Sequence, residues 1–341
     1  MQTQKPGILL INTGTPDSPE IPEVRRYLRQ FLWDYRVIDM HPVARWLLLN
    51  LVILPTRPKH SSEAYKKIWT DRGSPLIFHS EDLRDGLREK LPTALIEIGM
   101  AYGKPSIPDA IDSLLEQGAT RIVLVPMFPQ YASATVGGVL EVSYKTLSEK
   151  MNVPPITTVA PFYNHPAFLD AWAALSKPKL DAFKPEHVLL SYHGLPERHI
   201  KNCDPTGSHC LQKDGCCDNY LDANPHCYRA QCYATTKGLV ERLGIAPENY
   251  SHTFQSKLGK DPWLTPATDT TVAELAKKGI RRLAVLSPAF VADCIETDEE
   301  LGIQAHDSFM ENGGEELELL SSLNAKEEWV DAFAQILQEN L

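Results

Sequence analysis

A histidine and two glutamates stand where this sequence could carry out proton and metal chemistry. His193 follows the apolar run HVLLSY at residues 187–192 and precedes a Gly-Leu-Pro turn, so it should open onto a cleft. Histidine is the residue type that suits proton abstraction at neutral pH, although a histidine hydrogen-bonded within its own turn would show the same pattern. Glu296 and Glu300 are spaced so that a helix would place both carboxylates on one face. This pair could admit a divalent cation, or it could be the solvated acidic start of a helix.

The cysteines are concentrated in one segment. Six of the seven lie between residues 203 and 232. In a reducing compartment such clustering indicates a metal site sooner than disulfides. Four thiolates can hold a zinc ion or an iron–sulfur cluster, and uncomplexed redox thiols are the alternative. Cys232 falls inside the helix predicted to follow and is expected to be a packing residue. The candidate ligands are Cys203, Cys210, Cys216, Cys217 and Cys227.

Short apolar runs alternate with amphipathic stretches along almost the whole chain. The runs have the composition of buried strands, and the stretches between them have helical spacing. This alternation predicts an α/β fold of two similar Rossmann-like domains, each a doubly wound, mostly parallel four-stranded sheet. The predicted strands are 7–12, 94–99, 121–127, 156–160, 187–192, 250–254, 281–286 and 316–320, and the predicted helices are 21–32, 80–91, 106–117, 134–150, 228–243, 269–278, 297–312 and 326–341.

The predicted domains divide the chain near its middle. An N-terminal domain is expected over residues 1–163 and a C-terminal domain over 185–341, joined by a helical segment at 164–184. A cysteine-rich insertion, about 201–227, belongs to the second domain. Because ligands of parallel sheets bind beyond the carboxyl ends of the strands, the chemistry is expected in the loops that follow them.

Composition argues against several classes of function. The 341 residues include 34 Lys and Arg against 44 Asp and Glu, a net charge of −10. A dedicated nucleic-acid binder is not expected, because neutralising phosphates requires a basic surface. The first residues lack the features of a secretory signal, which predicts a cytoplasmic protein. The longest apolar run, Trp46–Pro55, is about half the ~20 residues of a membrane-spanning helix, so no integral membrane segment is expected.

Several motifs resemble those of ferrochelatases, the enzymes that insert Fe²⁺ into a porphyrin in the last step of haem synthesis. The motifs keep the family's order, and the resemblance covers nearly the whole chain. It implies two Rossmann-like domains with the active-site cleft between them, and insertion of Fe²⁺ into protoporphyrin IX with release of two protons. The motifs are GILLINTGTP at 7–16, RGSPL at 72–76, PQYASATVG at 129–137, LLSYHGLP at 189–196, FQSKLG at 254–259 with PWL at 262–264, and CIETDEEL at 294–301.

The resemblance also implies roles for individual residues. His193, in the HGLP motif, is implied to be the essential residue at the porphyrin face, and Glu296 the carboxylate on the same side of the cleft. Glu300 would lie one turn further along the route of the metal or the protons. These three side chains are the implied contacts of the substrate iron. The residues implied to contact the porphyrin are Thr13, Ser74, Tyr102, Gln130, Tyr131 and Trp263.

Three departures from the family pattern bear on the site. Thr13 stands where members that prefer coproporphyrin carry a tyrosine, which implies protoporphyrin IX as the substrate. Ala101 precedes Tyr102 where some members have an Arg-Tyr pair, so the resemblance implies no arginine contact to a propionate from this position. Cys294 replaces a histidine of animal members, and is either a soft metal contact or a bystander.

The cysteine-rich insertion resembles that of bacterial members that hold a [2Fe-2S] cluster within the chain. The ligand set expected from the resemblance is Cys203, Cys210, one of Cys216 and Cys217, and Cys227. Structural stabilisation and redox sensing are both open as roles for such a cluster.

Residues 31–54 match the family's active-site lip, an apolar edge that contacts a bilayer and lets the porphyrin pass. Arg45 and the apolar residues at 46–51 suit an interfacial helix, although burial in a core would explain the same pattern. Peripheral contact with the inner face of the cytoplasmic membrane is therefore one expectation.

Two other functions are compatible with such a fold. A carrier of tetrapyrroles or metals would bind without inserting, but it has no need of a proton acceptor such as His193 beside Glu296. A cobalt or nickel chelatase of related fold is the other alternative, and the motifs around Gln255 and Trp263 favour the haem branch over it. The type of residue alone does not select one divalent metal.

Overall fold

The computed structural model describes residues 5–219, 222–259 and 261–341. Residues 1–4 of the expected first domain and residues 220–221 of the expected cysteine-rich insertion lie outside the described residues. None of the helices in the described parts is long and apolar enough to cross a membrane.

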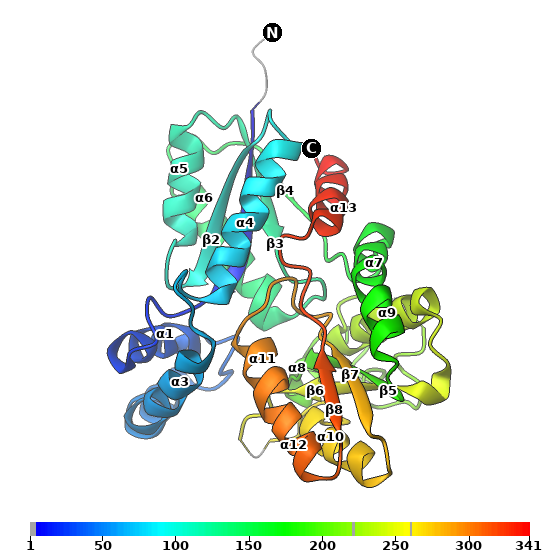
Figure 1. Ribbon diagram of the computed structural model, residues 1–341. Coiled ribbons are helices and arrows are strands. Elements are labelled where there is room, and N and C mark those ends of the chain that lie inside the picture. Colours follow the sequence, from blue (N-terminus) through cyan, green and yellow to red (C-terminus); the bar gives the residue numbers. More distant parts are fainter. Residues whose placement is uncertain (1–4, 220–221, 260) are drawn as a thin grey trace. The chain divides into compact units, whose positions relative to one another are not determined.

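The chain divides into two compact units, each with its own parallel sheet (Figure 1). The first unit takes in the chain up to Phe128, together with Ser133–Ala160 and Ala325–Leu341. The second comprises Pro129–Ala132 and Pro161–Asn324. The α/β class and the two Rossmann-like folds predicted from the sequence are confirmed.

The sheet of the first unit has the strand order β2-β1-β3-β4, with every neighbouring pair parallel. Its central strand forms because Ile8–Ile11 is an unbroken apolar run, 0–3% exposed, which suits a strand covered on both faces. The register sets Gly14 beside Tyr102, so the loops after the first two strands leave from the same edge. The strands are β1 (Pro6–Gly14), β2 (Leu95–Tyr102), β3 (Arg121–Pro126) and β4 (Ile156–Thr158).

Helix α5 (Ile107–Glu116) begins at a residue whose side chain caps it. The Ser106 hydroxyl accepts the Asp109 N–H at 3.2 Å, and a proline follows in the first turn. The helix predicted at 80–91 is α4 (Pro75–Lys90), and it begins earlier, at Pro75. Ser74 supplies an extended N-cap residue there, and Pro75 occupies the first helical position. The predicted helix at 134–150 is a short π turn followed by an α-helix. The elements are α1 (Ile21–Trp33), α4 (Pro75–Lys90), α5 (Ile107–Glu116), η2 (Ser133–Gly137) and α6 (Gly138–Ser148).

The expected lip, residues 31–54, begins with the end of α1 and with turns at 34–41, and then becomes a helical segment that runs on well beyond residue 54. This helical segment consists of α2 (Pro42–Leu47), the π turn η1 (Leu48–Ile53) and α3 (Leu54–Ile68). The π turn ends at Ile53, two residues before Pro55, which has no N–H to bond to the preceding turn. The proline therefore marks where the hydrogen-bond pattern changes within one continuous helical segment.

The C-terminal helix does not belong to the unit expected for it. Helix α13 (Glu327–Gln338) was predicted within a domain spanning 185–341, but it packs against α4 of the first unit. Gly86 permits the approach, since a Cβ at that position would lie 3.1 Å from a methyl of Val330. Lys90 and Asp331 add an ion pair. The buried face of α13, including Trp329 and Phe333, explains the attachment as burial of an apolar stripe.

The sheet of the second unit repeats the topology of the first, with the order β6-β5-β7-β8 and parallel pairing throughout. Its strands are β5 (His187–His193), β6 (Tyr250–Gln255), β7 (Arg282–Leu286) and β8 (Glu316–Leu319). The predicted connecting segment is the helix α7 (Pro166–Phe183), which is part of this unit.

The predicted helix at 297–312 is three pieces rather than one. Helix α11 (Ile295–Asp298) leads into the π turn η4 (Glu300–Ala305), and α12 (His306–Glu311) follows. Leu301 and Phe309 of this segment pack on β7 and α10, so its register is decided by core packing. The other helices are α8 (Glu197–Asn202), α9 (Tyr228–Leu243), η3 (Pro247–Asn249) and α10 (Thr268–Lys277).

Candidate active site

His193 is the last residue of β5 and is half-buried. Its Nδ1 lies 2.6 Å from the main-chain oxygen of Gly194. Because a carbonyl oxygen can only accept, this bond puts the hydrogen of the neutral imidazole on Nδ1 and leaves a lone pair on Nε2. His193 is therefore oriented to accept a proton through Nε2.

The turn after His193 requires a glycine. The Gly194 N–H donates to the main-chain oxygen of Gln255 at 2.8 Å, and a Cβ on Gly194 would lie only 2.6 Å from that oxygen. The same Cβ would lie 3.2 Å from the indole of Trp263, so this ring packs directly on the turn. The Leu264 N–H donates to the oxygen of Leu195 at 2.9 Å. The HGLP and PWL motifs, distant in sequence, are thus two halves of one structure.

In the second unit, Glu300 lies near enough to both Glu296 and His193 for their charges to act on it. Cys294 caps α11 through a reciprocal pair of hydrogen bonds with Thr297, so Cys294 has a structural role at this helix start. Burial and the charge of Glu296 raise the pKa of Glu300, against the opposing effects of Ser256, His193 and Gln255. Glu296 and His193 therefore both act electrostatically on Glu300, and Glu300 keeps a proton to higher pH than an ordinary glutamate.

Gln255 holds Glu300 in place, whereas sequence reasoning placed it in a family motif and assigned it no role in the site. The Ser191 hydroxyl donates to Gln255 Oε1 at 2.8 Å, which turns the amide nitrogen toward the glutamates. Gln255 Nε2 then donates to the main-chain oxygen of Glu296 at 2.7 Å and to Glu300 Oε2 at 3.1 Å. A polar pair, Gln255-Ser256, at the end of a buried strand was the available signal.

Ser256 is the second unpredicted partner of Glu300. Its hydroxyl donates to Glu300 Oε2. Its backbone has φ of 65°, a left-handed conformation that costs a residue other than glycine about 1 kcal/mol or more. The strand end therefore bends in a way that aims this hydroxyl at the carboxylate.

A third group missed by sequence reasoning is Asp298. Burial and the charge of Asp293 raise the pKa of Asp298 to about 6. This carboxyl, in the middle of the acidic stretch at 296–300, can exchange a proton close to neutral pH.

The raised pKa of Glu300 makes the free energy of unfolding depend on pH. The folded protein binds this proton more tightly than the unfolded chain, so stability is lost as pH rises from the ordinary value of 4.5 through the raised pKa. Replacing Glu300 by glutamine should remove this loss, and the variant should gain stability relative to the unaltered protein as pH increases. Urea unfolding at a series of pH values measures the difference. The exposed Glu311→Gln serves as control, and a pH-independent difference for Glu300→Gln would contradict the expectation.

In the first unit, the predicted porphyrin contacts lie near the ends of β1 and β2. Thr13 is half-buried, and its N–H is bonded by the side chain of Asn12 at 2.8 Å. The Ser74 hydroxyl is buried and donates to Thr15 at 3.0 Å. The Tyr102 hydroxyl donates to Asp34 Oδ2 at 2.8 Å. Burial and the charge of Asp34 raise the pKa of Tyr102, so its phenol stays protonated.

Gln130 and Tyr131 belong to the second unit. Gln130 is 2% exposed, and its amide nitrogen donates to the Thr235 hydroxyl at 3.0 Å. The Tyr131 N–H is bonded to Gln231, and its ring lies 5.3 Å from that of His226. The Gln130 amide is thus engaged within the protein, whereas the Tyr131 ring is half-buried.

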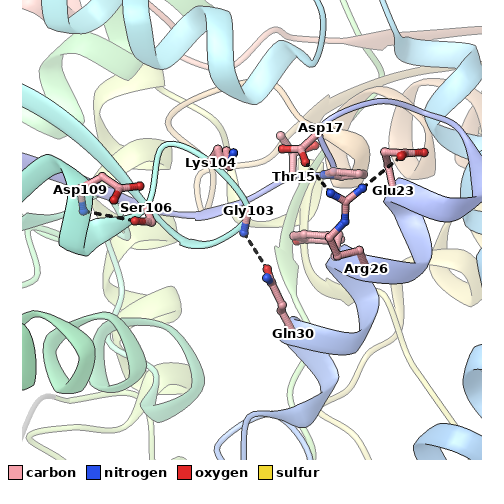
Figure 2. A pocket seen from close by; sticks show the side chains of 11 residues that line it. Thr15, Asp17, Glu23, Arg26, Gln30, Gly103, Lys104, Ser106 and Asp109 are labelled. Carbon is pink, nitrogen blue, oxygen red and sulfur yellow. Dashed lines mark hydrogen bonds and ion pairs between the residues drawn. The ribbon is translucent and has the colours of Figure 1, made fainter.

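The first unit contains a hollow of about 250 Å³ at the ends of β1 and β2 (Figure 2). Its charged groups are largely paired with one another. Arg26 lies between Asp17 and Glu23, at 3.5 and 3.0 Å, and the Gln30 side chain accepts the Gly103 N–H. None of the porphyrin contacts predicted from the sequence lines this hollow.

Asp204 organises the cysteine-rich segment. Its carboxylate accepts the main-chain N–H groups of Thr206, His209 and Cys210 at 2.7–2.9 Å, and the Thr206 hydroxyl as well. Burial alone would raise the pKa of Asp204, but these hydrogen bonds lower it well below its ordinary value. A single carboxylate therefore holds a loop that has little apolar core.

Four of the five candidate thiols contact one another in a chain. Cys227 hydrogen-bonds with Cys210 and with Cys217, and the Cys216 and Cys217 sulfurs are 3.8 Å apart. Burial raises the pKa of Cys210 to about 11. We call Cys210, Cys216, Cys217 and Cys227 the thiol cluster.

Arg229 supplies a positive charge to the thiol cluster. Its guanidinium donates to the Cys217 sulfur at 3.1 Å and lies 3.9 Å from that of Cys216. Cys203 shows no such contact: burial alone raises its pKa. Within the described residues, no three His, Cys, Asp or Glu side chains form a group that could hold a metal ion as they stand.

The lip presents apolar side chains to solvent. Val43, Leu47 and Leu51 are 61%, 44% and 64% exposed, and their spacing places them on one helix face. The expectation for Arg45 was different: it is buried, with its guanidinium 5.0 Å from the ring centre of Trp33. The cation–π contact explains its burial, since Arg45 stays inside while its apolar neighbours point outward.

The matching family model and two curated relatives of this chain are all described as ferrochelatases. The family model described as ferrochelatase matches residues 5–341. The ferrochelatase of Coxiella burnetii (strain CbuK_Q154) is 42% identical over 338 residues, which cover 99% of this chain and 94% of the relative. That of Pseudomonas entomophila (strain L48) is 43% identical over 328 residues, covering 96% of this chain and 97% of the relative.

Solved structures show the same fold at low identity. SirB from Bacillus subtilis with Fe³⁺ aligns with a TM-score of 0.55 at 13% identity, covering 99% of this chain and 96% of that one. At this identity the likeness concerns the fold alone.

Proposed function

Because the chain belongs to the ferrochelatase family over residues 5–341, and so is an enzyme that inserts iron into a porphyrin, we propose that His193, Glu296 and Glu300 carry out the exchange of protons for metal. Two pyrrole protons must leave the porphyrin as one Fe²⁺ enters it. The observation that carries the proposal is the hydrogen bond from His193 Nδ1 to Gly194, which leaves Nε2 with its lone pair.

His193 Nε2 takes one pyrrole proton and becomes an imidazolium, which the nearby carboxylates stabilise. It then releases that proton to solvent past the carboxylates and can accept the second pyrrole proton. Glu300 already holds a proton more tightly than usual because of burial and the Glu296 charge. Approach of a divalent cation reverses that effect, since a positive charge beside two carboxylates lowers their proton affinity. Proton release and metal arrival are thereby linked at one carboxylate pair.

We assign protoporphyrin IX as the substrate, on the threonine at position 13. The half-buried Thr13 and the half-buried rings of Tyr102, Tyr131 and Trp263 are the proposed contacts with the macrocycle. Ser74 and Gln130 are buried, with their polar groups bonded inside the protein, so their proposed role is to support the walls of the site.

An anaerobic assay with protoporphyrin IX and Fe²⁺ tests this function. Visible spectra should show loss of the free porphyrin and appearance of haem. Tight porphyrin binding without insertion would instead indicate a carrier, and insertion of cobalt or nickel but not iron would indicate a different chelatase.

The thiol cluster is the proposed site of a [2Fe-2S] cluster. Four contiguous buried thiols match its four ligands, and the Arg229 guanidinium offsets negative charge there. The ligands would be Cys210, Cys216, Cys217 and Cys227, so both cysteines of the adjacent pair are used and Cys203 is not. Such a group, when bound, can exchange one electron.

We further propose that the protein is cytoplasmic and contacts the membrane surface through the lip. Replacing both Leu51 and Val52, 64% and 57% exposed, by serine should lower partition onto vesicles of mixed neutral and anionic lipids by roughly tenfold or more. Cosedimentation measures the partition. The matched control replaces Met151 and Val153, an exposed apolar pair at 96% and 54%, by serine. Equal partition of both variants would contradict lip binding.

A further inference from the structure

The first turn of α9 connects the thiol cluster to His193. Cys227 is the N-cap of this helix and is fully buried, and Tyr228 is its first residue. The Tyr228 hydroxyl donates to the main-chain oxygen of His193 at 2.9 Å. A thiol of the cluster and a hydrogen bond to the candidate base therefore come from adjacent residues.

With this hydrogen bond, both polar groups of the peptide between His193 and Gly194 are bonded. The His193 carbonyl is held by Tyr228, and the N–H of the same peptide, on Gly194, donates to Gln255 at 2.8 Å. The next carbonyl, that of Gly194, accepts the bond from His193 Nδ1. The plane of this peptide group thus influences where the imidazole points and which of its nitrogens carries the hydrogen.

The position of Tyr228 is fixed by helix α9. It is 6% exposed, and its hydroxyl is in hydrogen-bond contact with the thiol of Cys232 one turn along α9. A displacement of the start of α9 would therefore displace the Tyr228 hydroxyl as well.

We propose that Tyr228 is a positioning residue for His193, and that occupancy of the thiol cluster acts on His193 through it. The proposal rests on the proposed function, in which His193 is the proton acceptor. Tyr228 bonds to the main chain of His193, and the proposed effect is on the orientation of the ring.

Tyr228→Phe tests the positioning role, with Tyr192→Phe as matched control. Tyr192 is also a buried tyrosine, next to His193 in β5, but its hydroxyl bonds with Thr236 at 2.9 Å. Loss of the Tyr228 bond should lower kcat about fivefold with little change in the KM for porphyrin. It should also change by about threefold or more the rate at which diethylpyrocarbonate acylates His193, followed by peptide mass spectrometry at several pH values. The control should leave both quantities unchanged.

The positioning role would be overturned if Tyr228→Phe and Tyr192→Phe had the same kcat and the same acylation rate of His193, whether both were changed or both unchanged. The acylation readout does not need turnover. If the unaltered protein failed to insert metal, the proposed function would fail while the test of Tyr228 would still give its answer.

The link to the thiol cluster is tested by a double-mutant comparison. Cys217→Ser should change the acylation rate of His193 in the unaltered background, and this change should disappear when Tyr228→Phe is also present. A change that persists in the double variant would show that another path connects the two sites. No change in either background would show that the thiol cluster does not act on His193.

Discussion

Replacing His193 by alanine is expected to lower kcat for metal insertion by about 10²- to 10⁴-fold, the usual contribution of a positioned general base. Porphyrin binding should be retained, because the macrocycle is held mainly by its large apolar area rather than by one imidazole. Anaerobic turnover and fluorescence quenching of the bound porphyrin measure the two quantities separately.

His60→Ala is the control, since His60 is exposed on α3 of the first unit. It should leave both turnover and binding unchanged. Undiminished turnover of His193→Ala would remove the proton-acceptor role, and loss of porphyrin binding with turnover would indicate a contact with the substrate instead.

Replacing Cys217 by serine is expected to abolish the visible absorption of an iron–sulfur cluster and the iron and sulfide that accompany it. The reason is that Cys217 contacts both Cys227 and Cys216, so it lies in the middle of the thiol cluster. Replacing Cys203 should leave the spectrum and the iron content intact, because Cys203 contacts none of the four sulfurs. Absorption spectra and metal analysis of the purified variants measure whether each one still holds the cluster.

This pair of variants separates two ligand sets. The set expected from the sequence contains Cys203 and only one of Cys216 and Cys217, whereas the structure favours both of the latter. Loss of the cluster absorption in Cys203→Ser would favour the ligand set expected from the sequence. A colourless unaltered protein with bound zinc would keep the thiols as a metal site and remove the iron–sulfur assignment.

Strands such as β1, β3 and β5 were predictable because they contain apolar runs that lie near glycine or proline. Burial on both faces of a parallel sheet leaves few polar positions within a strand, so β1, β3 and β5 stand out without any knowledge of their neighbours. Helix α9 was also predicted at its observed bounds, 228–243.

The segment 295–311 shows where local reasoning fails. Its composition is helical throughout, yet it contains a π turn between two short helices. A π turn depends on which side chains pack inward, here Leu301 and Phe309, and this is a property of the assembled core. The packing of α13 against the first unit has the same cause. The sequence of an amphipathic helix shows which of its faces is buried but not which element that face packs against.

The sequence by itself determined the α/β class, the repeated four-stranded sheets, the family resemblance, and the identity of His193, Glu296 and Glu300 as candidates. These follow from residue type and from spacing along the chain. Only the tertiary structure decided that Gln255 and Ser256 hold Glu300, that Tyr228 bonds the main chain of His193, and that four particular thiols form a chain beside Arg229. The physical reason is that hydrogen bonds and electrostatic shifts depend on distances of a few ångströms between residues that the sequence separates by tens of positions.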